Sequence, residues 1–339
     1  MVGGGFGGRH VRVVLVRWSW VHVVGVVVVM LGLGVVLFPQ ASNWFRARAH
    51  ATTIAGWAQA VERMPASVRE DVLQEAREFN EMLHRIAMDP YGMPMFPLSE
   101  EIYVQYRETL RPRPRAEGFG PASLAFGRIQ IPAINVDLPI FHGADGQHLA
   151  MGVGHTFGTD LPVGGAGKHA VLAAHSGLPT ERLFTDLFDL RYDDVFVVTV
   201  LDYELWYRVV ESRTVLPVNS EYLARQRGRD LITLVTCTPI GVNSHRYLVV
   251  GERTDPPPHM VDAQGRTLGD ITPGPGFPWW AIIWTGGTIV VILIARQDAK
   301  TTSKRLAHKH HKTTRKTPTS TSQPQPATDA SWVWCMVEP

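Results

Sequence analysis

The chain has little cysteine, little net charge and none of the common nucleotide or metal motifs. Among its 339 residues there are two cysteines, and the formal net charge is +2. A charge this small gives no argument for binding to nucleic acid. No metal-ligand spacing, phosphate loop or dinucleotide fingerprint is present, so the sequence indicates neither a metal nor a cofactor. No internal repeat is evident, and the length fits one large domain or two ordinary ones.

A first apolar run covers residues 18–38 and is interrupted only by one serine, one histidine and glycines. As a helix, it is long enough to cross about 30 Å of hydrocarbon. Arg9, Arg12 and Arg17 precede it, which by the positive-inside tendency places the N-terminus in the cytoplasm. No Ala-x-Ala cleavage site closely follows Phe38, so we expect an uncleaved anchor in preference to a signal peptide.

A second apolar run covers residues 277–295. Its tryptophans near one end favour a membrane interface, and Pro278 suits a first helical turn. The alternative of a buried core helix is disfavoured by the isolated position of the run and by its flanking charges. Both termini are then expected in the cytoplasm and residues of about 40 to 276 outside. The basic residues that follow the run are Arg296, Lys300, Lys304, Arg305, Lys309, Lys312, Arg315 and Lys316.

This topology separates the two cysteines. Cys237 is expected outside the cell and Cys335 inside, so they cannot pair. An unpaired thiol in an oxidising compartment indicates a chemical role for Cys237. Cys335 follows a segment rich in Thr, Lys and His that is expected to be disordered, and we assign it no role.

Residues 41–87 are rich in helix formers. Ser67 and Glu70 form a capping-box pattern, and apolar residues follow at spacings of four and three. This predicts an amphipathic helix that packs on the domain that follows it or on a neighbouring helix; a partner-binding helix is the alternative. Ser99 is expected to begin a second short helix that runs through Leu110. The apolar positions of the first helix are Val72, Ala76, Phe79, Leu83 and Ile86.

From Gly127 onward the pattern changes to short β-strands, after a linker rich in Pro and Gly at residues 111–121. Close spacing of strands and turns predicts a barrel or a sandwich. A short helix over residues 181–187 is expected to interrupt the strands. The predicted strands cover residues 128–132, 136–141, 170–174, 195–200, 203–210, 231–236 and 247–250.

Cys237 lies where a predicted strand ends, and a short loop leads from it into the strand that carries Arg246. Side chains alternate between the two faces of a strand. If Arg246 points toward Cys237, His245 and Tyr247 therefore point away. Reactive side chains are often presented at strand ends beside loops.

Nucleophilic chemistry at a cysteine needs the thiolate, and an ordinary thiol with a pKa of about 8.5 is only about 3% ionised at neutral pH. A nearby histidine can take the proton and return it to a leaving amine. His175 ends a predicted strand and opens a turn, although a hydrogen-bonded surface histidine is the alternative. The histidines of the predicted barrel and of the linker after it are His142, His148, His155, His169, His175, His245 and His259.

Arg246 cannot act as a base, so its role would be electrostatic or positional. A permanent cation suits the oxyanion of acyl transfer. The alternative is an arginine at a strand end that forms a surface ion pair.

Thr236–Pro239 followed by Asn243–Arg246 resembles the active-site signature of sortases, the cysteine transpeptidases of Gram-positive cell envelopes. Together with Gly241 and the ending at residues 248–253, the signature is most similar to the class C, pilus-assembling members. Ile240 stands where an aromatic residue is common and Ser244 where Thr is common, which bears on substrate fit.

Upstream segments extend the resemblance. His175–Pro179 matches the histidine and Gly-Leu-Pro turn of the class, and residues 138–143 and 152–165 match as well. Ser176 departs from a frequently basic position. The resemblance implies Cys237, His175 and Arg246 as the catalytic residues and a mainly β fold. This fold is a closed eight-stranded sortase-type β-barrel with N-terminal helices and a lid, flanked by two transmembrane helices.

Asp89, Pro90 and Tyr91 precede Gly92, and by themselves they are typical of a turn. Class C sortases carry an Asp-Pro-aromatic lid before the barrel, so the resemblance implies a lid here. Asp89 would pair with Arg246 and Tyr91 would cover Cys237. Substrate would have to displace both contacts, which makes the segment a gate.

The resemblance also implies the reaction. Cys237 would attack the Thr–Gly bond of an LPxTG-like sorting signal in a pilin, and a lysine amine of another pilin would resolve the thioacyl enzyme. The alternatives are a housekeeping sortase that anchors surface proteins to the cell wall, and an inactive envelope scaffold. The expected partners are those surface proteins or pilins and the lipid bilayer. The expected location is the membrane of a Gram-positive bacterium, with two spans and an extracellular catalytic domain.

The expected organisation is a cytoplasmic N-terminus at 1–17, a transmembrane helix at 18–38, a helical region at 39–120 with the lid at 88–92, the barrel at 121–254, a linker at 255–276, a transmembrane helix at 277–295 and a basic, disordered cytoplasmic tail at 296–339.

Overall fold

The computed structural model describes residues 20–87, 98–112, 125–261 and 275–314. Its contacts separate two compact units, one formed by residues 1–33 and 284–339 and the other by residues 34–283. The first unit holds the apolar helical segments, and the second holds a β-barrel with the helices that pack on it.

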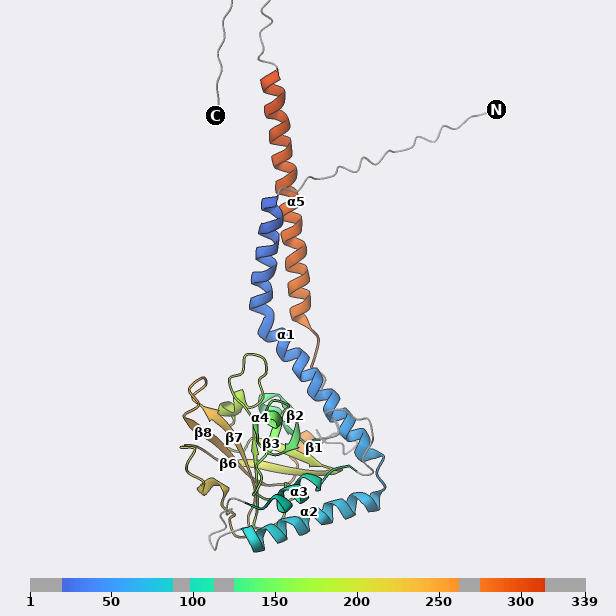
Figure 1. The fold of residues 1–339 in the computed structure, drawn as a ribbon, viewed down its shortest axis with the longest axis vertical. Coiled ribbons are helices and arrows are strands. Elements are labelled where there is room, and N and C mark those ends of the chain that lie inside the picture. The colour runs from blue at the N-terminus through green and yellow to red at the C-terminus, as the bar shows by residue number, and fades with distance from the viewer. Residues whose placement is uncertain (1–19, 88–97, 113–124, 262–274, 315–339) are drawn as a thin grey trace, which may run out of the picture. The chain divides into compact units, whose positions relative to one another are not determined.

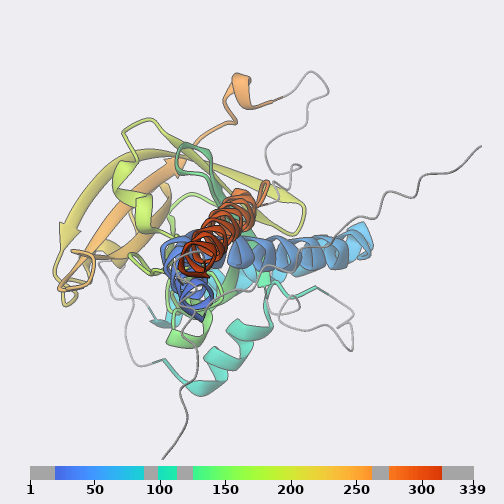
Figure 2. The same cartoon turned by 90° about the horizontal axis from the view of Figure 1, so that it is seen from above.

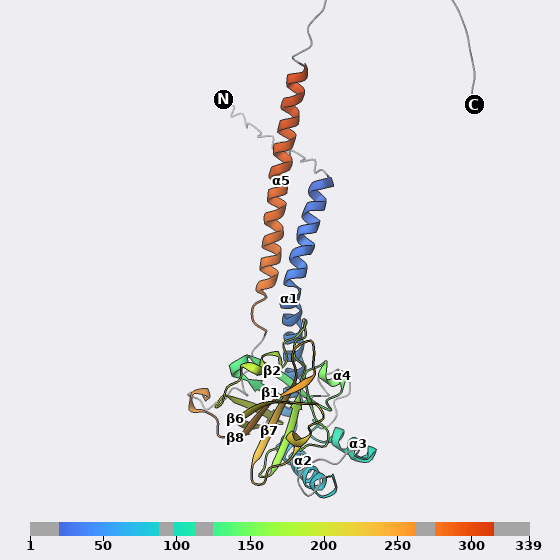
Figure 3. The same cartoon turned by 90° about the vertical axis from the view of Figure 1, so that its left-hand side faces the viewer.

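Two helices, α1 (Trp20–Glu62) and α5 (Trp279–Thr314), are long and apolar enough to cross a membrane by length and composition (Figures 1 and 3). Helix α1 continues through Pro39, so the first predicted span and the helical segment after it form one helix. Helix α5 continues to Thr314, so the prediction of a disordered tail is wrong for residues 296–314. Lys and Arg together make up six of the nineteen residues of that stretch, and both favour helix.

Helix α2 (Ala66–Ala87) packs its apolar face on the barrel, as predicted. Asn80 fixes the contact, because its side chain accepts a hydrogen bond from Leu161 N (2.8 Å) and donates one to Leu161 O (3.0 Å). Ile86 was expected on the same face but is 52% exposed, since the buried face ends one turn earlier. The buried residues of the face are Val72, Ala76, Phe79 and Leu83.

Of the two predicted helix N-termini, the one at Ser99 is confirmed and the one at Ser67 is wrong. The amide of Arg69 donates to the carbonyl of Pro65 (3.1 Å), so α2 begins at Ala66 and Ser67 lies inside its first turn. The capping-box prediction at Ser67 is therefore wrong. Ser99 does cap helix α3 (Glu100–Glu108), where its side chain accepts from Ile102 N at 3.5 Å, and the helix ends two residues before the predicted Leu110. Both helices lie on the same end of the barrel in Figures 1 and 3.

Eight strands close into a barrel in the order β1-β2-β3-β4-β7-β8-β6-β5, and β5 pairs back with β1. Figure 2 shows the same fold from above. The eight-stranded barrel implied by the resemblance is confirmed. Two neighbouring pairs, β2 with β3 and β4 with β7, are parallel, and the others are antiparallel. The strands are β1 (Ala125–Ile131), β2 (Val136–His142), β3 (Val153–His155), β4 (Lys168–Ala173), β5 (Val195–Val200), β6 (Tyr203–Val215), β7 (Asp230–Thr238) and β8 (His245–Arg253).

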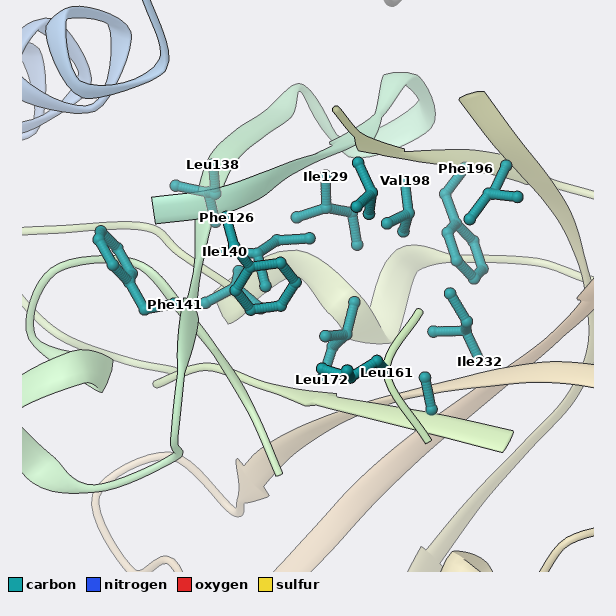
Figure 4. Close-up of a cluster of buried hydrophobic side chains, with 14 of the residues drawn as sticks. Phe126, Ile129, Leu138, Ile140, Phe141, Leu161, Leu172, Phe196, Val198 and Ile232 are labelled. Carbon is teal, nitrogen blue, oxygen red and sulfur yellow. The ribbon is translucent and has the colours of Figure 1, made fainter. Parts of the chain in front are cut away.

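The barrel interior is filled by apolar side chains from several strands, as Figure 4 shows for Phe126, Ile140, Leu172, Phe196 and Ile232. Such burial is the main favourable term in folding. The helix predicted at residues 181–187 is not formed. A β-bridge joins residues 178 and 181, and a short 3₁₀ turn, η3, covers Thr185–Asp189.

Three histidines inside or against the barrel, His142, His155 and His169, make its stability dependent on pH. Burial lowers the pKa of all three, that of His155 to about 4. Unfolded histidine binds a proton near pH 6.5, so the stability is fully present above that pH and is lost as the pH falls toward 4. At pH 5, His155 alone accounts for a loss of about 2 kcal/mol.

We therefore expect a lower thermal midpoint at pH 5 than at pH 7 for the detergent-solubilised chain. Burial raises the pKa of Asp160 to about 6 and also raises those of Glu181 and Asp230, which offsets part of the loss, but burial lowers the pKa of a fourth histidine, His50, to about 4. His155→Gln, which replaces a buried imidazole with a side chain that does not titrate, should flatten the pH dependence. Equal midpoints at the two pH values would contradict this account.

Candidate active site

The antiparallel pairing of β7 with β8 brings Cys237 and Arg246 together. Their Cα atoms are direct partners in the register, as are those of Thr238 and His245. Side chains of directly opposite residues lie on the same face of a sheet, with Cβ atoms about 4.5–5.5 Å apart. The thiol and the guanidinium therefore project from one face of adjacent strands.

His175 reaches the same place through the parallel pairing of β4 with β7. Ala173 is the register partner of Val235, and beyond the end of β4 the amide of Ala174 still donates to the carbonyl of Val235 (3.1 Å). The hydroxyl of Ser176 donates to the carbonyl of Cys237 at 2.6 Å. These contacts keep residues 174–176 beside residues 235–237. At the two-residue period of a strand, His175 falls on the face of Cys237.

That face is the outside of the barrel. Ile232 and Leu234 belong to the large core inside the barrel, whereas Val235, which shares the alternation of Cys237, belongs to a small separate cluster. A 3₁₀ turn, η4 (Glu221–Leu223), covers this cluster with Leu223. Cys237, His175 and Arg246 are each half-buried, so a substrate could reach them from solvent while the strands hold their backbones.

The guanidinium of Arg246 is held by the loop that joins β7 to β8. Its Nη1 donates to the carbonyls of Asn243 and His245, both at 3.1 Å. Asn243 has φ 58°, a left-handed conformation that Asn tolerates better than most residues. Burial raises the pKa of Tyr222 in η4, and the positive charge of Arg246 opposes this rise. Arg246 therefore acts electrostatically on groups at the outer face.

The other histidines of residues 125–261 lie elsewhere or have other partners. His142, His155 and His169 are buried, and His148 Nδ1 lies 2.7 Å from Asp145 in the cap of a short helix, α4 (Gly146–Leu149). His245 is one residue out of phase with Arg246 and bonds Ser244. Tyr247 packs on Phe188 and the barrel core, as the alternation predicts. Among the seven histidines of residues 125–261, all of them described, the register places His175 beside Cys237.

Two neighbours of His175 were not singled out by sequence reasoning as site residues. Ser176 was noted only as a departure from a basic position, yet its hydroxyl joins the histidine segment to the cysteine backbone. Gly177 has φ 70°, and a Cβ there would collide with Ile240 of the β7–β8 loop. The Gly in the turn after His175 was the available signal, because a glycine there permits both the conformation and the close approach.

The predicted lid residues Asp89, Pro90 and Tyr91 lie outside the described residues. Within the described ranges, no group of three or more His, Cys, Asp or Glu side chains is arranged to hold a metal ion.

A closed barrel with a cysteine, a histidine and an arginine on one outer face has the architecture of a cysteine acyl-transfer enzyme. Comparison with known proteins identifies the group. The model of the sortase domain matches residues 129–254. Sortase A of Bacillus anthracis is 32% identical over 126 residues, which are 37% of this chain and 58% of that protein.

Two solved structures are similar over most of their own length. Sortase C1 from Streptococcus agalactiae has 33% identity and a TM-score of 0.52, covering 59% of this chain and 97% of that one. A lid mutant of sortase A from Corynebacterium diphtheriae has 39% identity and a TM-score of 0.50, covering 57% and 98%. The chain belongs to the sortase family of cysteine transpeptidases. It spans less than two thirds of the curated sortase A from Bacillus anthracis that it matches.

Proposed function

We propose that this chain is a membrane-anchored transpeptidase that cleaves an LPxTG-like sorting signal and transfers the product to an amine. The observation that carries this proposal is the strand register, which brings Cys237, His175 and Arg246 to one outer face of the barrel. A structural scaffold would have no need for an exported free thiol at such a position.

The three residues suffice for acyl transfer. The Cys237 thiolate attacks the carbonyl carbon of the Thr–Gly bond, and Arg246 stabilises the negative oxygen of the tetrahedral intermediate. The C–N bond then breaks, and protonated His175 gives its proton to the leaving Gly amine. An incoming lysine amine attacks the thioacyl carbonyl, loses its proton to His175 and releases the Cys237 thiolate.

Polymerisation of pilins is the finer proposal. It is supported by the similarity to sortase C1 and by α5, a second apolar helix after the barrel. The competing activity, attachment of surface proteins to the cell wall, is supported by the similarity to proteins named sortase A. The positive residues before residue 18 and after residue 295 favour two membrane crossings, with the barrel on the extracellular side.

The products distinguish the two activities. The enzyme would be incubated with a pilin subunit that carries both a sorting signal and a surface lysine. Pilus polymerisation predicts ladders of covalently linked subunits in denaturing gels, and a subunit whose lysines are replaced by arginine should give none. Single adducts to a small wall-type amine, without ladders, would support the wall-anchoring activity instead.

We also propose that Asp89, Pro90 and Tyr91 form a lid over the site. A solved relative is described as a lid mutant, which supports a lid in this family. Asp89→Ala and Tyr91→Ala should each raise the rate at which a thiol reagent labels Cys237, by about tenfold if the lid is closed about nine tenths of the time. Glu100→Ala, on the exposed first turn of α3, is the matched control. Unchanged labelling in both lid variants would remove the gating proposal.

A further inference from the structure

A cavity of about 960 Å³ lies within the unit of residues 34–283 and includes none of the three proposed catalytic residues. Helix α1 lines it from Leu37 to Ala51, and strands β1 and β2 with the turn between them line it from Gln130 to Leu138. The other walls come from residues 181–186 and from residues 275–283, where α5 begins. A ligand there would therefore contact both apolar helices and the barrel.

The cavity lies where the two apolar runs end, which is where a membrane surface would meet them. Leu37 lies at the end of the first apolar run, and Trp280 and Ile283 lie at the start of the second. The Trp280 ring contacts Trp44 at 6.3 Å and Phe45 at 5.6 Å between centroids. Tryptophans gather where headgroups meet hydrocarbon, so polar and apolar parts of a lipid could both reach this cavity.

Glu181 is an unsatisfied group of the cavity. It is 4% exposed, and its Oε1 forms an ion pair with Arg46 Nε at 3.0 Å, whereas its Oε2 is buried with no hydrogen-bond partner among the described residues. His50 Nε2 is 3.7 Å from Oε2, beyond hydrogen-bond distance. Burial lowers the pKa of His50 to about 4, so this imidazole is neutral at pH 7 and supplies no charge. A buried carboxylate oxygen without a donor favours a ligand that brings one.

The charges of the cavity suit a zwitterion. Two arginines, Arg46 and Arg182, face two carboxylates, Glu181 and Asp186. Asp186 is already paired with Arg182 at 2.6 Å, and 52% of the Arg46 side chain is exposed. Glu181 is then available for a cation and Arg46 for an anion. The indole nitrogen of Trp280 is also buried without a partner among the described residues and can donate to the anion.

We propose that this cavity binds a phospholipid whose headgroup ends in a primary ammonium. The ammonium donates to Glu181 Oε2, the phosphate lies at the guanidinium of Arg46, and the acyl chains follow Leu37, Trp280 and Ile283. The choline headgroup has no N–H donor, and the glycerol headgroup has no positive charge. Neither reproduces the pairing with Glu181.

The lipid would also act on the proposed catalytic site, a consequence that rests on the proposed function. Residues 175–186 carry His175 at one end and Glu181 with Asp186 near the other. The amide of Phe184 donates to the carbonyl of His175 (3.0 Å), and the amide of Gly177 donates to Thr185 Oγ1 (2.9 Å). The segment is thus folded on itself, and a lipid that orders its cavity side restrains the backbone of His175.

Binding is tested on the full chain with Cys237→Ala, so the result does not depend on turnover. Native mass spectrometry would compare phosphatidylethanolamine, phosphatidylcholine and phosphatidylglycerol added to the protein in detergent. We expect the ethanolamine lipid to bind at least about tenfold more tightly than the other two. Glu181→Gln should remove this preference, and Asp186→Asn, a carboxylate of the same cavity already paired with Arg182, should retain it.

Equal binding of the three lipids, or a preference that survives Glu181→Gln, would overturn the proposal. Arg46→Gln gives a second test if Glu181→Gln does not fold, because the half-exposed Arg46 side chain is less needed for packing. This variant should weaken binding of the ethanolamine lipid about tenfold, and unchanged binding would again count against the site.

Discussion

Cys237→Ala is expected to lower kcat/KM for cleavage of a sorting-signal peptide by at least about 10⁴-fold, because no other group at the site can form the thioacyl intermediate. Chromatography would measure the release of the C-terminal fragment of the peptide. Cys335→Ala removes the other cysteine and should retain full activity. The same peptide should form a thioester-linked adduct with the wild-type enzyme and none with Cys237→Ala, observed as a mass increase of the intact chain.

The double variant tests whether Cys237 and His175 act as a unit. His175→Ala by itself should lower kcat/KM by about 10³-fold or more, because both the proton transfer to the leaving amine and the stabilisation of the thiolate are lost. If the two residues serve one mechanism, Cys237→Ala with His175→Ala should be no worse than Cys237→Ala. If the two decreases in kcat/KM were additive, His175 would not act together with Cys237 in the reaction.

Arg246→Ala is expected to lower kcat by about 10²–10³-fold, the usual cost of removing one oxyanion donor, which corresponds to about 2.7–4 kcal/mol. KM should change much less, since the charge develops only in the transition state. Arg246→Lys should recover only part of the loss. A lysine keeps the charge but cannot donate to the Asn243 and His245 carbonyls while presenting a planar fork to the oxyanion.

Arg213→Ala is the matched control for Arg246. Arg213 lies on β6, next to β8, and forms a partly exposed ion pair with Glu211 at 3.4 Å. Loss of this pair should leave kcat unchanged, because surface ion pairs of this kind contribute little. An equal decrease in both variants would point to a general effect of charge near the barrel. A normal kcat in Arg246→Ala would contradict the oxyanion role directly.

Seven of the eight strands were predictable because each has an extended run of apolar and β-branched residues. Strand β3 was missed because it contains only Val153–His155, too short for an alternation to be visible. The alternation also predicted the relation between Arg246, His245 and Tyr247, which depends only on neighbouring residues. The α2 face was predictable for the same reason, apart from its last turn.

The position of His175 beside Cys237 was not predictable from local pattern. It depends on the parallel pairing of β4 with β7, and the sequence between them contains two complete strands. Only the family resemblance selected His175 from the seven histidines of residues 125–261. Glu181 was not predicted as a site residue for a different reason. The sequence of its segment predicts a helix, but a β-bridge between residues 178 and 181 is formed instead, and Glu181 lies in the wall of a cavity.

The parallel β4–β7 pair determines when, during folding, the thiol of Cys237 comes close to His175. Such a pair forms only after a long loop has closed, so it is expected among the slower steps of folding. On the proposed topology, a chain that is still crossing the membrane would hold Cys237 far from His175. The thiol would then gain its reactivity only when the barrel closes, after the proposed export.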